Sequence, residues 1–491
     1  MTGTHKVVRN SLFGVAAEAV GGAMSFFIII LIARKLGTVS FGLFSFVLAL
    51  TGIFQLVADF GLTNIIVKEI SRARADTIKV ISAVKPLVWL FSGSILLVMA
   101  AVAYPLVPSH EIYLASLIMG AAVLTTFHAV VYGSVCRAHE DMGYNAIAFI
   151  SHKVVLLGLV LLVLWQDQGV IGVAAAYLIA NVYQWIFYYW VVRRRYLGNG
   201  SVRWRVDIPY WKYLIAEAFP VGLAMVFRRS SLHAGTLILT AMSTPSAVGI
   251  FNAAYRVIQM VDMIPFTLSI PLFPPFTRMA MESRQRLFDT LERVMGIFML
   301  LAAPIFFLMF FMAGQVIEAF YGPAYLEGVT ALRILAGAVL FLFPTGLFVY
   351  VFTALGQQRY YSWSSGICLG INIVVCLALI PTFGYAGAAL ATLAAEVAFF
   401  ISGMVLLQRL GFAVHYFQVF GKPLLVAGLA AAWMFFLPQG GHPLISLLLA
   451  VVGYGVAYPA AVLLFGLVNK QDLGLVLEAV KRKPAERGGP A

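Results

Sequence analysis

The sequence is poor in charge. Only 11% of its 491 residues are Asp, Glu, Lys or Arg, whereas soluble domains contain about 25%. Hydrophobic residues make up 62% of the chain, against about 45–50% in soluble domains, and the mean hydropathy is +0.94. This composition excludes an ordinary soluble protein and indicates a chain solvated mainly by lipid.

Cysteine and enzyme motifs are also scarce. Of the three cysteines, Cys368 and Cys376 lie in one apolar stretch, roughly 12 Å apart along a helix, which is too far for a disulfide. The chain has no P-loop, His-x-x-Glu-His, Cys-x-x-Cys or Gly-x-Ser-x-Gly motif, and single histidines such as His128 do not make a metal site. We therefore expect a protein that is not an enzyme and has no cofactor and no metal. An ATP-driven pump would need a nucleotide-binding domain on another chain.

Long apolar runs dominate what remains. A transmembrane helix needs about 20 mostly apolar residues, and fourteen runs meet this requirement. They are 8–33, 42–61, 86–107, 113–135, 145–165, 170–192, 217–241, 246–270, 294–313, 329–352, 362–381, 387–408, 420–437 and 443–467. The first run contains Glu18 and has no small-residue cleavage site, so we expect a retained helix rather than a signal peptide. The predicted fold is an all-α polytopic membrane protein with about fourteen transmembrane helices.

The basic residues predict the orientation. With the N-terminus in the cytoplasm, the loops and tails on that side hold nearly all Lys and Arg residues outside the spans, and the outside loops hold only Arg34 and Lys35. This asymmetry predicts cytoplasmic N- and C-termini in the cell inner membrane. It also accounts for the net charge of +13 without a nucleic-acid partner. The outside loops are short, and the longest, about 314–328, is predicted to contain a small helix at residues 316–320.

Two segments recur along the chain. Phe41–Phe44 parallels Val248–Phe251, and Gly169–Ala180 parallels Gly384–Ala395 at a similar offset. An even number of spans separates the copies, so the sequence predicts two parallel six-helix lobes followed by two additional C-terminal helices. Gly and Ala patterns in packed membrane helices are the alternative explanation. The expected units are 1–200 (spans 1–6), 201–412 (spans 7–12), 413–468 (spans 13–14) and a cytoplasmic tail, 469–491.

The same segments resemble a known family. Ala33–Gly37 with Phe41–Phe46, then Asp59–Leu62 and Lys68–Ile70, look like the opening of the bacterial polysaccharide and O-antigen flippases. Ile380–Ala389 is similar to that family's turn between helices 11 and 12. The family belongs to the superfamily of multidrug, oligosaccharidyl-lipid and polysaccharide exporters.

The resemblance implies a two-lobed transporter that moves undecaprenyl-pyrophosphate-linked sugar units from the inner to the outer leaflet. Family members often have an acidic residue in the middle of helix 7, where this chain has the basic run Phe227–His233. A coupling role for an acid at that place is therefore not expected here.

Charged residues inside the spans are the candidate site. Insertion of each charged side chain at the bilayer centre costs at least ~2.5–3.5 kcal/mol, so we expect each one to have a structural or functional role. One interpretation is a cationic chamber for a pyrophosphate or acidic sugar, because guanidinium groups bind phosphate oxygens bidentately. The other is internal pairing with Glu18, Glu217, Asp262 or Glu396. The candidate substrate-binding residues are Lys153, Arg228, Arg229, His233, Arg256 and Arg333. Because Arg228 and Arg229 point about 100° apart, one could line a cavity while the other pairs.

Acidic residues within the spans have two interpretations as well. Glu18, Asp262 and Glu396 could be coupling carboxylates in a proton-driven cycle, or could neutralise an arginine. Outside the spans, Arg34 and Lys35 could guide an anionic headgroup or extend to lipid phosphates.

These observations favour a flippase for a polyprenyl-pyrophosphate-linked oligosaccharide that works by alternating access. A cation-coupled multidrug exporter of the same superfamily is the alternative, and a membrane polysaccharide polymerase or glycosyltransferase is a weaker one because the outside loops are short. We expect a monomer whose partners are the lipid-linked oligosaccharide and membrane lipids. Polysaccharide-assembly proteins are candidate partners.

Overall fold

The structure is a computed structural model that describes residues 3–107, 109–198, 202–436 and 442–467. All the regular elements in these ranges are helical. The first seven are α1 (Gly3–Asp59), α2 (Leu62–Arg72), α3 (Thr77–Leu106), α4 (His110–Ala138), α5 (Met142–Trp165), α6 (Gly169–Val192) and α7 (Ile208–Met242). Those that follow are α8 (Pro245–Ser269), α9 (Phe273–Glu282), α10 (Arg284–Phe311), α11 (Ala313–Tyr321), α12 (Val329–Thr345), α13 (Phe348–Ala354), α14 (Gln358–Arg409), α15 (Lys422–Ala431) and α16 (Pro443–Leu464). Short helices link them, among them η2 (Arg193–Leu197) and η4 (Pro323–Gly328).

The predicted membrane fold is confirmed. Eleven helical stretches of the described residues are long and apolar enough to cross a membrane. Two of them contain two arms each, because α1 breaks at Gly37 (φ 72°) and α14 breaks at Gly384 (φ 52°), a left-handed conformation that glycine adopts at little cost. Helix α7, with arginines near its middle, is not among these eleven, but at 35 residues it is long enough for one more crossing. The crossings thus agree with the fourteen predicted runs, although the last run but one ends among residues outside the described ranges.

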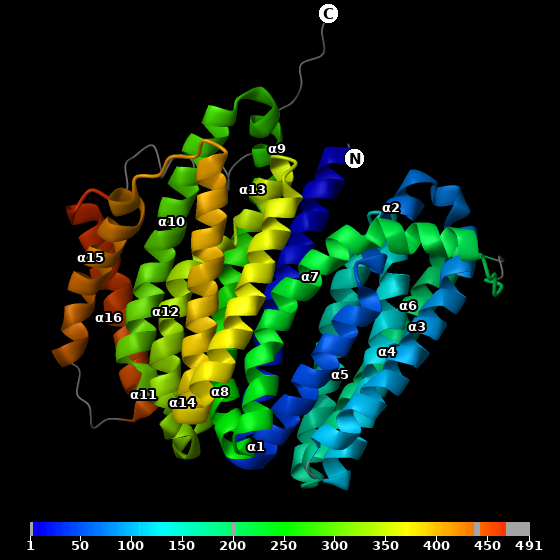
Figure 1. Cartoon of the computed structure of the whole chain (residues 1–491), viewed down its shortest axis with the longest axis horizontal. Helices are drawn as coiled ribbons and strands as arrows, with labels where there is room; N and C mark the ends of the chain where they lie inside the picture. The colour runs from blue at the N-terminus through cyan, green and yellow to red at the C-terminus, as the bar shows by residue number, and fades with distance from the viewer. Residues whose placement is uncertain (1–2, 108, 199–201, 437–441, 468–491) are drawn as a thin grey trace, which may run out of the picture.

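Figure 1 shows how these helices are arranged. Helices α3 to α6 stand together on one side, and α10 to α16 stand on the other. The two arms of α1 run in opposite directions between them, joined at the break. The N-terminus, α2 and α9 lie at one end of the bundle, which we call the α2 end, and the break in α1 lies with α11 at the opposite, α11 end (Figure 1). Helix α11 is the short helix that the sequence predicts at residues 316–320, within the loop 314–328.

Helix α7 connects the two sides. Its first turns pack on the N-terminal half of the chain, where the indole of Trp211 donates to the Ala83 carbonyl (2.7 Å) and Glu217 pairs with Lys68 (2.5 Å). Its later turns contact the C-terminal half, where Thr236 donates to Asn252 of α8 (3.1 Å). The residues in the middle of α7 therefore lie at the junction of the two halves.

Candidate functional site

A buried ion pair occupies one face of α7. Arg228 donates to both carboxylate oxygens of Glu396 on α14, at 2.7 and 3.2 Å, and their side chains are only 16% and 5% exposed. The guanidinium also lies 4.7 Å from the centre of the Phe399 ring and 3.8 Å from the sulfur of Cys368. Arg228 and Glu396 thus neutralise each other inside the C-terminal half. Of the two interpretations that the sequence leaves open for Arg228, internal pairing is the one that the structure has.

The next residue is in a different environment. Arg229 is exposed, and it has no hydrogen bond or ion pair among the residues that the structure describes. One turn further along, His233 lies within electrostatic range of both Arg229 and Arg256. Its imidazole rests against Gly52 in the second arm of α1, where an added Cβ would lie 2.8 Å from the ring. This face of α7 is therefore turned toward the N-terminal half.

Arg256 extends the same charged region from α8. Its side chain is half-buried and donates one hydrogen bond, to the Gln259 amide oxygen (2.8 Å), while its buried Nε has no partner in the described chain. The guanidinium lies within electrostatic range of the phenols of Tyr177 on α6 and Tyr321 on α11. The hydroxyl of Tyr321 is likewise buried without a hydrogen-bond partner in that part of the chain.

We call Arg229, His233 and Arg256 the cationic cluster. Its members come from α7 and α8; His233 lies against α1, and Arg256 lies within electrostatic range of side chains on α6 and α11, so elements from both halves of the chain lie near the cluster. Unpaired guanidinium N–H groups of this kind are donors that match phosphate or carboxylate oxygens. The sequence identified the three basic residues but missed Tyr177 and Tyr321, since phenols in an apolar run carry no signal of their own.

Two other predicted basic residues are separate from the cluster. The ammonium group of Lys153 on α5 lies 5.4 Å from the centre of the Phe149 ring. Arg333 on α12 is exposed and donates to the carbonyl of Phe310 (3.3 Å). Neither has a hydrogen bond or ion pair with the cationic cluster in the part of the chain that the structure describes.

The predicted carboxylates also have different surroundings. Glu396 is engaged by Arg228, whereas Glu18 is exposed and Asp262 is half-buried, and neither of these has an ion pair among the described residues. Asp262 lies within electrostatic range of the Arg228–Glu396 pair. Glu18 is on the first arm of α1, within electrostatic range of Tyr350.

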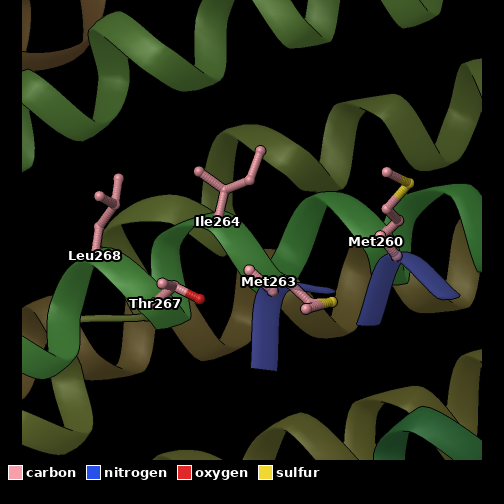
Figure 2. Close-up of a pocket in the computed structure, with 7 residues that line it drawn as sticks. Met260, Met263, Ile264, Thr267 and Leu268 are labelled. Atoms are coloured by element: carbon pink, nitrogen blue, oxygen red, sulfur yellow. The ribbon is translucent and has the colours of Figure 1, made fainter. Parts of the chain in front are cut away.

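An apolar cavity of about 280 Å³ lies between the first arm of α1 and α8. Figure 2 shows its α8 side, with Met263 next to the ribbon of α1. Its lining residues are Ala19, Ala23, Met260, Met263, Ile264, Thr267 and Leu268. Met260, Met263 and Thr267 follow Arg256 at helical spacing, so the cavity and the guanidinium share one face of α8, with Met263 about 10 Å along the helix from Arg256.

Sequence comparison places this chain among proteins of sugar-polymer synthesis. The family described as "Polysaccharide biosynthesis protein" matches residues 7–280. An uncharacterized membrane protein of Methanocaldococcus jannaschii is 22% identical over 246 residues, which are 49% of this chain and 48% of that protein. The chain thus spans about half the length of this curated relative.

Solved structures share the fold over most of the chain. The lipid II flippase MurJ, in an inward closed conformation, has a TM-score of 0.77 at 14% identity and covers 92% of this chain and 98% of its own. An inward-facing multidrug resistance transporter of the MATE family, in the MOP superfamily, has a TM-score of 0.66 at 14% identity and covers 82% of this chain and 98% of its own. At these identities the similarity establishes the fold alone.

Proposed function

Because the chain belongs to the family of polysaccharide biosynthesis proteins, we propose that it is a flippase for a polyprenyl-diphosphate-linked oligosaccharide. The observation that carries this proposal is the cationic cluster of Arg229, His233 and Arg256 between the two halves of the chain. An unpaired charge inside a membrane is costly unless it serves a ligand or an aqueous path. A diphosphate supplies the missing partner, because its oxygens accept from guanidinium groups on α7 and α8 at once.

The apolar cavity supports a lipid-linked substrate. A diphosphate held at Arg256 would direct an attached prenyl chain along the α8 face that carries Met260, Met263 and Thr267. Methionine side chains adapt to flexible apolar ligands, which suits a polyprenyl chain. A multidrug exporter of cationic compounds would instead need unpaired negative charge beside the cluster.

Coupling to an ion gradient would use Glu18 and Asp262, the two candidate carboxylates that have no ion pair among the described residues. Asp262 is six residues, about 1.7 turns, from Arg256 on α8, so its protonation state would alter the electrostatic potential at a diphosphate bound there. Glu396 is excluded from this role in the proposal because Arg228 neutralises it.

We further propose that residues 1–200 and 201–412 act as two lobes that rock about the cluster, with 413–468 outside the repeat and both termini in the cytoplasm of the inner membrane. The asymmetry of the basic residues supports this orientation. Single cysteines at Ser109, Gln168 and Thr244 should react with an impermeant thiol reagent in intact cells. Labelling at Arg72 and Arg195 in their place would invert the orientation.

Complementation tests the function directly. The chain is expressed in bacterial strains that lack their own polysaccharide flippase, and surface polysaccharide and accumulated lipid-linked oligosaccharide are measured together. We expect surface polysaccharide to return and the precursor to fall, and an Arg256→Ala variant of equal abundance to restore little. Normal abundance and membrane insertion without any export, in strains that make different sugar units, would refute the proposal.

A further inference from the structure

Two helix ends are capped reciprocally at the α11 end of the bundle. Arg34, at the end of the first arm of α1, donates from Nε to the Phe320 carbonyl (2.7 Å) and from a terminal nitrogen to the Ala319 carbonyl. These are among the last carbonyls of α11, which have no partner within their own helix. A guanidinium also complements the negative end of the helix dipole.

Tyr325 supplies the return contact. Its hydroxyl donates to the Ala33 carbonyl (2.8 Å), which lies in the last turn before α1 breaks at Gly37. The tyrosine is only 1% exposed and packs edge-on against Phe41, with ring centres 6.1 Å apart. Each helix end thus receives its donor from the other half of the chain.

Helices α1 and α8 also approach each other closely at this end. A Cβ on Gly42 would lie 1.8 Å from the Pro245 carbonyl oxygen, and one on Gly249 would lie 2.0 Å from the Thr38 carbonyl oxygen. Ser246 also donates to the Thr38 hydroxyl (3.0 Å). Backbones this close leave no path between α1 and α8, so the two halves are in contact along this pair of helices at the α11 end.

We propose that Arg34 and Tyr325 form a latch that holds the α11 end closed and that must release for this end to open. The proposal rests on the alternating-access flippase proposed above. It accounts for the position of Arg34 better than snorkelling to lipid phosphates, because both of its contacts are helix carbonyls of the opposite half. Tyr321, whose ring centre is 5.6 Å from that of Tyr325 and which lies in range of Arg256, connects the latch with the cationic cluster.

Lys35 provides a matched control. It is the neighbour of Arg34 and carries the same charge, but it pairs with Asp167 (2.9 Å), in the turn between α5 and α6 of the N-terminal half. Lys35→Ala therefore removes a cation at the same depth without removing a contact between the halves.

Opening is measured with a buried reporter. Ser45 is 2% exposed and follows Thr38 and Gly42 at helical spacing, so Ser45→Cys lies on the arm face that meets α8. A water-soluble thiol reagent should label it only when this end opens. The three native cysteines are buried, and their labelling in the chain without Ser45→Cys gives the background.

Adding Arg34→Ala should raise the labelling rate of Ser45→Cys about ten- to a hundredfold, because hydrogen bonds from a charged group are lost and the rate follows the open fraction. Tyr325→Phe, which removes one neutral hydrogen bond, should raise it about two- to tenfold, and Lys35→Ala should leave it unchanged. Labelling of Arg34→Ala at the rate of Lys35→Ala would overturn the latch. Since labelling needs no substrate, a chain that exports nothing but shows this dependence on Arg34 would refute the proposed function and support the latch.

Discussion

Arg228 and Arg229 are consecutive residues of α7 in different surroundings. Arg228 is held bidentately by Glu396 within the C-terminal half, beside the ring of Phe399. Arg229 is exposed and, with His233 and Arg256, belongs to a group of basic side chains without an anion among the described residues. The two arginines thus illustrate two roles of a charged side chain within a membrane. A neutralised pair fixes how two helices pack, and an unpaired group can bind a ligand.

Variants of the buried pair and of the cationic cluster should therefore have different defects. Removal of one member of a buried pair leaves an uncompensated charge and destabilises the fold. Removal of a cation that has no ion pair leaves no stranded charge, so it should reduce transport and leave the fold intact. Variants in the two regions distinguish these outcomes.

The largest effect is expected at the buried pair. Arg228→Ala should destabilise the protein by about 3–5 kcal/mol because it strands the Glu396 carboxylate. Membrane abundance and thermal stability in detergent measure the loss. The double variant Arg228→Met/Glu396→Leu should recover abundance, since no charge remains unpaired. A single variant as stable as the parent would remove the contrast between the two regions.

At the cationic cluster, Arg256→Ala should lower export about ten- to a hundredfold at normal abundance, as expected for a charge-assisted contact of roughly 1.5–3 kcal/mol. Arg256→Lys should recover only part of it, because an ammonium group cannot form the bidentate contact. Export is compared with protein level in the same cells. Full export by Arg256→Ala would exclude this residue from the site.

A smaller effect is expected where α1 meets His233. Gly52→Ala places a methyl group 2.8 Å from the imidazole, so the ring must shift. We expect a cost of about 1 kcal/mol in stability, at the low end for overpacking, with export reduced severalfold. Gly93→Ala, on α3 with open space around the added Cβ, is the control. Equal behaviour of the two variants would mean that the His233 position is not critical.

The smallest effect is expected for a membrane cation outside both regions. Arg333 is exposed, and its one hydrogen bond among the described residues is to the Phe310 carbonyl. Arg333→Ala should change stability by less than about 0.5 kcal/mol and leave export unchanged. A loss as large as that of Arg256→Ala would extend the site to α12.

Local patterns predicted the helices well. Runs of about 20 apolar residues located the crossings, and the gaps at 34–41 and 382–386 between consecutive runs contain the breaks at Gly37 and Gly384, because hydrophobicity is a property of adjacent residues. The basic run on α7 was enough to predict that Arg228 and Arg229 point in different directions.

Long-range partners could not be predicted in the same way. Glu396 is one of four acidic residues that the sequence analysis considered as partners of the arginines. Only the packing of α14 on α7 brings it next to Arg228. Glu217, another of the four, pairs with Lys68. The contact of Arg34 with α11 joins residues nearly 300 positions apart, for which no periodicity provides a signal.

Ligand binding by the purified chain tests the role of the cationic cluster most directly. Native mass spectrometry in detergent with a polyprenyl diphosphate should show a bound lipid on the parent protein and on Arg333→Ala. Occupancy should fall at least tenfold for Arg229→Ala and Arg256→Ala, both folded as judged by thermal stability. Equal occupancy in all four proteins would contradict the assignment of the anion site to the cluster between the two halves.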